Sequence, residues 1–526
     1  MGENKNNYEN VHWADFAAQR VLNIYPDKEV YTVASGITPS GIIHVGHFRE
    51  IITTELVRRA LERKGKKTHF IYSWDSYDAF RKVPKNIPQE WDKYLRLPDA
   101  SVPDPWDCHE SFGEHWMQEA EEALEFFKFP VEFQRQHKLQ TSGIYADGIK
   151  RALVNREKVR PLLDKYRKEP LSRDWFPLTV YCEECEKDTT TVSNYDEEYT
   201  LDYECKCGYK NTINFKETPI VKLSWRLDWP MRWDYYNVTF EPCGKDHAST
   251  GGSWTTGKDI VKEVFDIEGP VDTFYTNVRM KGQGGKVSSS SGNGATIPDV
   301  LEIYTPELVM FLFAGTRPNA EFDISFDLDV IKIYEDYDKL ERLYYGLEEE
   351  KNEKKRVTQN RIYELSQVGD DLSTQKEIPF QPSFRHLLSV IQSNDFDFDK
   401  IKEYYKDEIK TDFDLSRLQQ RFECAKNWIE MYAPEEMVFS IKKSVVIELD
   451  DKQKEIVKQV VVALEDSTDA KSLFGEFKII AQNNELEVPV FFKLMYNIIT
   501  GNDKGPKLGG LMIENKEKIL ALLRSI

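Results

Sequence analysis

The first 75 residues alternate between apolar runs typical of strands and one long amphipathic segment. Residues 30–35 predict a short buried strand, and a glycine-bounded turn follows at residues 36–41. Apolar side chains then keep helical spacing at Phe48, Ile51, Ile52, Leu56, Val57, Ala60 and Leu61. The segment ends near Gly65, and residues 68–72 predict a second strand. This order of strand, helix and strand predicts a βαβ unit with a parallel sheet.

The later pattern divides the chain into further regions. Residues 85–220 are broken by Pro and Trp and carry two Cys/His clusters, which indicates an insertion. The α/β pattern resumes near Val221, with a strand expected at residues 272–276 and a Gly/Ser-rich loop from Gly282 to Gly294. After residue 300 helical spacing dominates. We therefore predict an α/β protein in which a Rossmann-type catalytic domain (residues 1–84 and 221–300) holds a zinc-bearing insertion (85–220) and is followed by helical regions (301–350 and 351–526).

Composition and charge narrow the class of protein. Hydrophobic residues make up 40% of the 526 and aromatic residues 13%, too many for a disordered chain. No apolar run has the roughly 18 residues of a membrane helix, and Met1–Asn10 lacks the apolar core of a signal peptide. The net charge of −19 argues against non-specific coating of nucleic acid. We expect a soluble cytoplasmic protein with no membrane partner.

Two motifs together predict a nucleotide site. His44-Val45-Gly46-His47 begins the first long helix, where unpaired amides favour anions and two imidazoles at i and i+3 share a face. Lys286-Val-Ser-Ser-Ser290 lies in the Gly/Ser loop, where a lysine and hydroxyl groups can close over phosphates. Alone, the first motif can be two surface histidines and the second a linker. In this order, with an insertion between them, they favour ATP binding.

These residues resemble the class I aminoacyl-tRNA synthetases, and within them the class I lysyl-tRNA synthetases. His44–His47 is similar to the first signature of the superfamily and Lys286–Ser290 to the second. The lysyl group is indicated by Gly36–Gly41, Trp74–Asp78 with Arg81–Pro84, Asp228–Trp233, and Gly244–His247 before Gly251–Ser253. The resemblance runs from about residue 10 to 340.

The resemblance implies a lysine–tRNA ligase that uses ATP and Mg²⁺. Lysine would be activated to its adenylate and passed to the 3′ end of tRNA(Lys). Catalysis would fall to His44, His47 and Lys286, with Lys281 as the second candidate lysine. The nucleotide would contact Thr38, Pro39, Ser40, Gly46, Lys286, Ser288, Ser289 and Ser290. Family architecture implies acceptor-stem binding by the insertion, stem contacts for residues 301–350 and anticodon binding for 351–526. A monomer is expected.

The pattern around residues 225–254 bears on the choice of amino acid. Four of the eleven tryptophans lie there, interleaved with Asp228, Asp234, Asp246 and His247. An ammonium on an apolar stem needs a carboxylate, an aromatic face and apolar walls. Tryptophans at i, i+4 and i+8 can instead form a core stripe, which we expect for at least two of the three. Pro230 breaks the helical spacing and favours a loop-borne pocket residue. The predicted lysine contacts are Gly36, Thr38, Asp228, Trp229, Asp246, His247 and Tyr275, with Asp246 preferred to Asp228 for the ammonium.

Two clusters predict structural zinc. Cys182-x2-Cys185 and Cys205-x-Cys207 supply four thiolates, the closed set of a structural site. Asp104, Cys108, His109 and His115 offer a second set within twelve residues, which on chemistry alone can equally be scattered loop residues. The family resemblance favours two zinc sites. Four protein ligands leave no open position, so both sites are expected to stabilise the insertion.

Two alternatives remain open at this point. One is a class I synthetase for glutamate or cysteine: a glutamate pocket calls for an arginine pair, and a cysteine enzyme for zinc at the amino-acid site. The other is a non-catalytic zinc-bearing RNA-binding protein on a synthetase scaffold. The presence of both imidazoles and the loop lysine argues against the second.

Overall fold

The computed structural model describes residues 11–281, 295–369 and 377–526. The chain divides into two compact units. The first comprises Met1–Leu301, Pro306–Ile324 and Leu343–Thr374, and the second Glu302–Thr305, Ser325–Arg342 and Gln375–Ile526. The predicted Lys286, Ser288, Ser289 and Ser290 lie outside the described residues.

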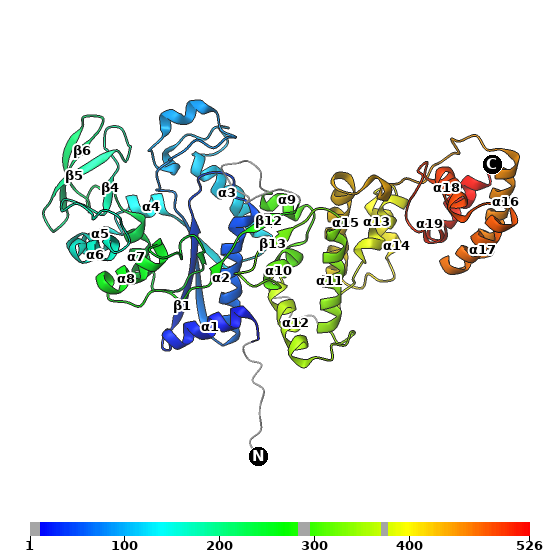
Figure 1. The fold of residues 1–526 in the computed structure, drawn as a ribbon, viewed down its shortest axis with the longest axis horizontal. Coiled ribbons are helices and arrows are strands. Elements are labelled where there is room, and N and C mark those ends of the chain that lie inside the picture. The colour runs from blue at the N-terminus through cyan, green and yellow to red at the C-terminus, as the bar shows by residue number, and fades with distance from the viewer. Residues whose placement is uncertain (1–10, 282–294, 370–376) are drawn as a thin grey trace, which may run out of the picture. The chain divides into compact units, whose positions relative to one another are not determined.

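A parallel sheet forms the centre of the first unit (Figure 1). Its order is β3-β2-β1-β9, with bounds β1 (Val30–Ile37), β2 (Lys67–Trp74), β3 (Val131–Arg135) and β9 (Val238–Phe240). Beyond β9 the chain of residues 271–275 continues the parallel pairing, through a bridge of Phe240 to Val271 and the pairing of β10 (Cys243–Gly244) with β11 (Phe274–Tyr275). This order, 3-2-1-4-5, is that of a Rossmann-type sheet, which confirms the predicted α/β class.

Helix α2 (Val45–Arg63) connects β1 to β2 and confirms the predicted βαβ unit. All seven apolar positions that predicted it are buried. Its N-cap is His44, and Gly65 follows its C-cap with φ of 74°, a conformation that favours glycine. Helix α1 (Trp13–Ile24) packs beside it. The helix therefore presents its N-terminus, with the His44–His47 motif, at the carboxyl end of β1.

The region between β2 and residue 220 holds one strand of the central sheet as well as separate elements. Helix α3 (Phe112–Glu125) leads into β3, so a second parallel crossover lies within the range predicted for the insertion. The other elements of this region, with β8 just after it, are η1 (Gln89–Tyr94), η2 (Asp99–Ser101), α4 (Gln136–Thr141), α5 (Ala146–Val154), α6 (Arg156–Asp164), β4 (Leu178–Val180), β5 (Thr190–Tyr195), β6 (Thr200–Cys205), β7 (Lys210–Asn214) and β8 (Val221–Leu223). Strands β5, β6 and β7 form a small antiparallel sheet, and β4 pairs with β8.

The remaining elements of the first unit lie after β8. They are α7 (Trp225–Tyr235), α8 (Ser253–Phe265), β12 (Val278–Met280), α9 (Ile297–Leu301), α10 (Pro306–Ala314), β13 (Phe322–Ile324) and α12 (Glu353–Ser366). A buried ion pair of Arg361 with Asp15, 2.9 Å, ties α12 to α1. The range predicted as the start of a separate helical domain thus contributes a helix to the first unit.

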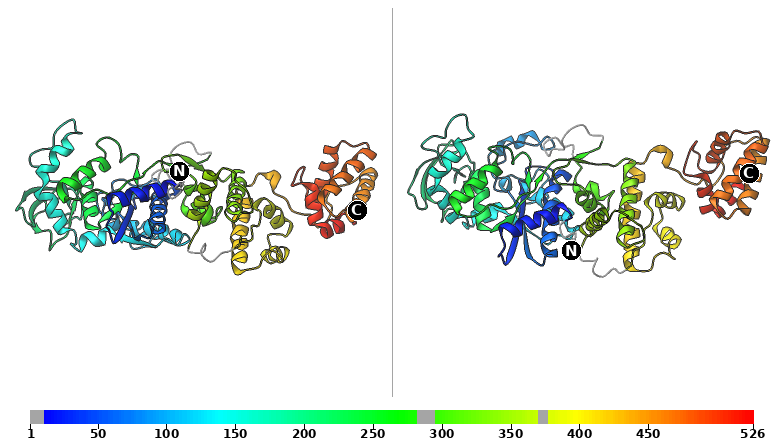
Figure 2. Two further views of the ribbon diagram at one scale, coloured as in Figure 1. Left: turned by 90° about the horizontal axis from the view of Figure 1, so that it is seen from below. Right: turned by 60° about the horizontal axis from the view of Figure 1, so that its bottom comes forward.

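Every regular element described in the second unit is a helix. These are α11 (Asp329–Tyr344, whose last two residues belong to the first unit), α13 (Phe384–Ser393), α14 (Phe398–Tyr404), α15 (Asp412–Met431), η4 (Glu435–Met437), α16 (Asp451–Asp466), α17 (Ala470–Asn483), α18 (Val488–Ile499), α19 (Leu508–Glu514) and α20 (Lys516–Leu523). Helices α16 to α20 pack around a core of their own (Figure 2). Among the described residues no helix combines the length and the apolar character needed to cross a membrane.

Candidate active site

Two adjoining cavities open at the carboxyl ends of the parallel strands, where open α/β sheets bind ligands. The outer cleft has a volume of about 1060 Å³ and the inner pocket about 460 Å³. Residues that line both are Thr38, His47, Glu50, Asp78, Arg81, Gly244, His247 and Tyr275. The outer cleft adds Ser40, His44, Gly46 and Asp246, and the inner pocket adds Gly36 and Trp229. The structure thus brings most of the predicted site residues to one place, while Pro39 and Asp228 line neither cavity.

In each of the two histidines of the first motif, the ring is held by a hydrogen bond at its own Nδ1 atom. The amide of Gly46 donates to His44 Nδ1 (3.1 Å), and the amide of His44 donates to His47 Nδ1 (3.2 Å). The rings are stacked with centroids 3.9 Å apart. Because each Nδ1 accepts a hydrogen bond, each neutral ring carries its proton on Nε2. Both imidazoles therefore have a hydrogen-bond donor suited to phosphate oxygens.

Two glycines of the site are required by close packing. A Cβ at Gly46 would lie 2.8 Å from His44 Cε1, and one at Gly36 would lie 2.4 Å from the carbonyl oxygen of Ser73 on β2. The sequence suggested that Gly46 lets an adenine ring approach the backbone. The structure gives Gly46 a second reason, because a side chain there would displace the His44 ring.

The chain on either side of residues 282–294 is fixed near the histidine motif. The amide of Lys281 donates to the carbonyl of Ile324 (2.9 Å). Ala295, the first described residue after the gap, accepts a hydrogen bond from the amide of Val45 (3.0 Å), and Thr296 forms a bridge with His44. The described chain therefore resumes directly beside the N-terminus of α2.

Helix α7 forms an aromatic wall of the inner pocket. Trp225, Trp229 and Trp233 lie on successive turns, with Trp225 and Trp229 stacked at 4.8 Å and Trp229 edge-on to His247 at 5.9 Å. The expectation that Pro230 makes this segment a loop is wrong, because Pro230 lies inside α7. A proline removes only one helix hydrogen bond, and burial of the helix face outweighs this loss. The indole N–H groups of Trp229 and Trp233 both donate to Glu241, at 2.9 and 2.6 Å.

Two carboxylates that the sequence reasoning missed face the inner pocket. Glu50, on α2, accepts hydrogen bonds from the Gly36 amide (3.2 Å) and the Tyr275 hydroxyl (2.8 Å). Burial raises the pKa of Glu50 to about 8 and that of Glu241 to about 7. Neither forms an ion pair with a residue that the structure describes. A signal was available: Glu50 shares a helix face with His47, and Glu241 directly follows a parallel strand.

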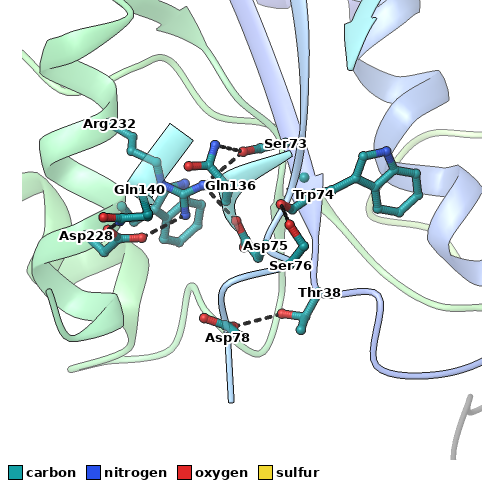
Figure 3. A network of polar contacts seen from close by, with 12 residues as sticks. Thr38, Ser73, Trp74, Asp75, Ser76, Asp78, Gln136, Gln140, Asp228 and Arg232 are labelled. Carbon is teal, nitrogen blue, oxygen red and sulfur yellow. Dashed lines mark hydrogen bonds and ion pairs between the residues drawn. The ribbon is translucent and has the colours of Figure 1, made fainter. Parts of the chain in front are cut away.

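The two predicted aspartates lie in different surroundings. Asp228 is buried and pairs with Arg232 (3.2 Å), whose guanidinium also contacts Asp75 (2.7 Å), as Figure 3 shows. Burial raises the pKa of Asp228, and the charge of Arg232 opposes this shift. Asp246 is exposed in the outer cleft. Arg232 is thus engaged by two aspartates.

The two predicted metal sets are each assembled. In both, one ligand atom from every residue lies within 4.8 Å of the others. The Sγ atoms of Cys182 and Cys207 are 3.7 Å apart and those of Cys185 and Cys205 3.6 Å, close to the edge of about 3.8 Å expected for tetrahedral zinc. In the second set Cys108 Sγ lies 3.1 Å from His109 Nδ1 and 3.4 Å from His115 Nδ1, and 3.2 Å from Asp104. Both donor sets fit zinc.

Comparison with known proteins then decides the family. Residues 11–369 match the family described as tRNA synthetases class I (K). The chain belongs to this family. The lysine–tRNA ligase of Borreliella burgdorferi is 45% identical over 520 residues, covering 97% of this chain and 98% of the relative. Those of Treponema pallidum and Pyrococcus furiosus are 40% and 38% identical, covering 96% and 98% of this chain and 96% and 99% of the relatives.

Family membership confirms the function that the resemblance implied. The chain is a class I aminoacyl-tRNA synthetase of the lysine group, a ligase, and neither the glutamate or cysteine synthetase nor the non-catalytic scaffold was the better prediction. The relatives align over nearly the whole chain, so the agreement includes the C-terminal helices.

Proposed function

We propose that the inner pocket binds lysine and that the outer cleft binds ATP. The observation that carries the assignment is a pair of carboxylates, half-buried Glu50 and buried Glu241, without an ion-pair partner among the described residues. A buried carboxylate is costly unless a cation joins it. Lysine brings two cations, its α- and ε-ammonium groups, on an apolar stem that fits the wall of α7.

The hydrogen-bond donors of the pocket add to this preference. The Gly36 amide and the Tyr275 hydroxyl donate to Glu50, and the indoles of Trp229 and Trp233 donate to Glu241. These four donors are occupied by carboxylates of the protein and are not available to a ligand carboxylate. Such a lining suits ammonium groups and disfavours a second carboxylate, as in glutamate.

In the first step the lysine carboxylate attacks the α-phosphate of ATP, and pyrophosphate leaves. The Nε2–H groups of His44 and His47 donate to phosphate oxygens, and Thr38, Pro39, Ser40 and Gly46 surround the nucleotide. Lys286 and Ser288 to Ser290 bind the phosphates. Mg²⁺ accompanies ATP and neutralises its charge. A hydroxyl of the terminal adenosine of tRNA(Lys) then attacks the lysyl carbonyl, and AMP leaves. The anticodon arm of this tRNA binds the helices of the second unit.

Zinc binds at both donor sets and acts structurally. The Cys182, Cys185, Cys205 and Cys207 site joins the turn after β4 to the hairpin of β6 and β7. Four protein ligands close each site, which leaves no position for a substrate. A monomer and a cytoplasmic location remain predictions.

The decisive experiment is pyrophosphate exchange with each of the twenty amino acids, with and without tRNA. We expect exchange with lysine alone. Exchange with glutamate or cysteine, or no exchange with any amino acid, would contradict the proposal. Norleucine, which lacks the ε-ammonium, is the matched control and should fail to support exchange.

A further inference from the structure

Asp78 ends the Trp74–Asp78 motif after β2 and lies between the two cavities. Its carboxylate accepts a hydrogen bond from the Thr38 hydroxyl, 3.0 Å (Figure 3), and forms an ion pair with Lys222. Thr38 and Asp78 line both cavities, whereas Lys222 lines neither. Nothing in the reaction described above uses Asp78.

The surrounding backbone holds Asp78 in place. Its amide donates to the carbonyl of Asp75 (3.0 Å), and its carbonyl accepts from the amide of Asp99 (2.8 Å). Lys222 is 7% exposed and belongs to β8, which pairs with β4. The two charges therefore come from separate, anchored segments. Burial acts to raise the pKa of Asp78, but the Lys222 ammonium holds it below its usual value.

The charge of Asp78 decides where the Thr38 proton points. A hydroxyl has one proton to donate and two lone pairs, and an ionised carboxylate can only accept. With its proton on Asp78, the Thr38 oxygen offers only lone pairs to the pocket. A ligand group there must be a donor, and an ammonium is the strongest such donor.

We propose that Asp78 is a positioning residue that, with Lys222 as its counter-ion, fixes Thr38 as an acceptor for the α-ammonium of lysine. The inference rests on the proposed lysine pocket. It assigns Thr38 to the α-ammonium because Thr38 directly follows β1, beside Gly36 and the nucleotide cleft. Holding that ammonium orients the neighbouring carboxylate toward ATP.

A double-mutant cycle in the full-length protein tests this inference. In Asp78→Asn, the side-chain amide oxygen accepts from Lys222 and the side-chain N–H₂ group donates to the Thr38 oxygen. The Thr38 hydroxyl proton then points into the pocket. Thr38→Val removes the acceptor, and Thr38→Ser keeps it. Asp78→Asn and Thr38→Val should each raise the lysine KM about tenfold, the loss of one hydrogen bond to a charged group, and Asp78→Asn should leave the ATP KM within about twofold. The double variant should be no worse than the poorer single variant, and Thr38→Ser should be near wild type.

A lysine analogue distinguishes the loss of this one contact from general damage to the pocket, which would weaken every ligand. 6-Aminohexanoic acid lacks the α-ammonium, so its inhibition constant should be the same for wild type and Asp78→Asn. Lys222→Met, outside both cavities, should raise the lysine KM in the same direction, because an unpaired buried Asp78 takes up a proton and can donate to Thr38. Thermal melting checks that each variant is folded; if Asp78→Asn does not fold, Lys222→Met and the Thr38 pair carry the test.

Additive losses in the double variant, equal weakening of 6-aminohexanoic acid, or an unchanged lysine KM in Asp78→Asn would overturn the inference. These outcomes leave lysine-dependent exchange by the wild type intact. Failure of the proposed function would instead appear in the wild type, as absent exchange with lysine or as exchange with norleucine.

Discussion

The inner pocket and the outer cleft share eight lining residues, yet they hold their polar groups in different ways. In the inner pocket, side-chain donors from several segments are bound to carboxylates, as at Glu50 and Glu241. In the outer cleft, His44 and His47 are held by backbone amides through Nδ1, and we propose that their Nε2–H groups donate to the phosphates. The carboxylates of the inner pocket are the groups proposed to pair with the ammonium groups of lysine, so this pocket should govern lysine binding. The outer cleft provides donors for charge that develops during the reaction and should govern the rate.

The largest effect on the reaction rate is expected from a change in the outer cleft. Lys286→Ala should lower the kcat of adenylate formation by about 10²–10³, the usual loss for one transition-state donor, with little change in the lysine KM. Single-turnover measurements of adenylate separate the two quantities. Lys281→Ala is the matched control. Unchanged turnover with only the ATP KM raised would exclude this role for Lys286 and favour Lys281.

In the inner pocket, removal of one carboxylate charge should weaken the binding of lysine. Glu50→Gln or Glu241→Gln should weaken lysine by ~2 kcal/mol, about thirtyfold in KM, with the ATP KM unchanged. Asp246→Asn and Asp228→Asn belong in the same series, because the sequence favours one of them for the ammonium. If only Asp246→Asn weakens lysine, the binding carboxylate lies in the outer cleft, and the comparison drawn above is wrong.

The same comparison predicts that lysine binding in the inner pocket depends on pH. An ammonium needs an ionised partner, and burial raises the pKa of Glu50 to about 8. Below that pH the empty pocket holds a proton that lysine must displace. The lysine KM should therefore fall as pH rises from 6 to 8, by up to about tenfold per unit, and then level off. A flat lysine KM over this range would count against Glu50, and Glu50→Gln should abolish its share of the slope.

The smallest kinetic effect is expected from the metal sites, which touch neither cavity. Cys182→Ser should lose about one zinc per chain and lower the melting temperature, because structural zinc is coupled to local folding. Both KM values should stay within about twofold. Metal analysis of the wild type should give about two zinc ions per chain, and Cys108→Ser should remove the other. A wild-type protein free of zinc would refute both sites.

The local sequence was enough for features whose residues are close together in the chain. The periodicity from Phe48 to Leu61 predicted α2 because a helix repeats every 3.6 residues and its buried face must be apolar. The histidine motif and the two metal sets were found for the same reason, since their chemistry depends on short spacings. Even there, the loop predicted from Pro230 was wrong. The prediction considered the helix hydrogen bond that a proline removes but not the burial that α7 gains from its neighbours.

Only the tertiary structure decided which carboxylates face the inner pocket. Glu50 became a candidate when β1 and the strand of residues 271–275 brought the Gly36 amide and the Tyr275 hydroxyl to its oxygens. Asp228 pairs with Arg232, and the same guanidinium pairs with Asp75, which is distant in sequence. Asp78 gained its partner from β8, 144 residues away along the chain. The sequence determines residue types and local periodicity, whereas burial and pairing, which set the charge state of each carboxylate, exist only once distant segments have packed together.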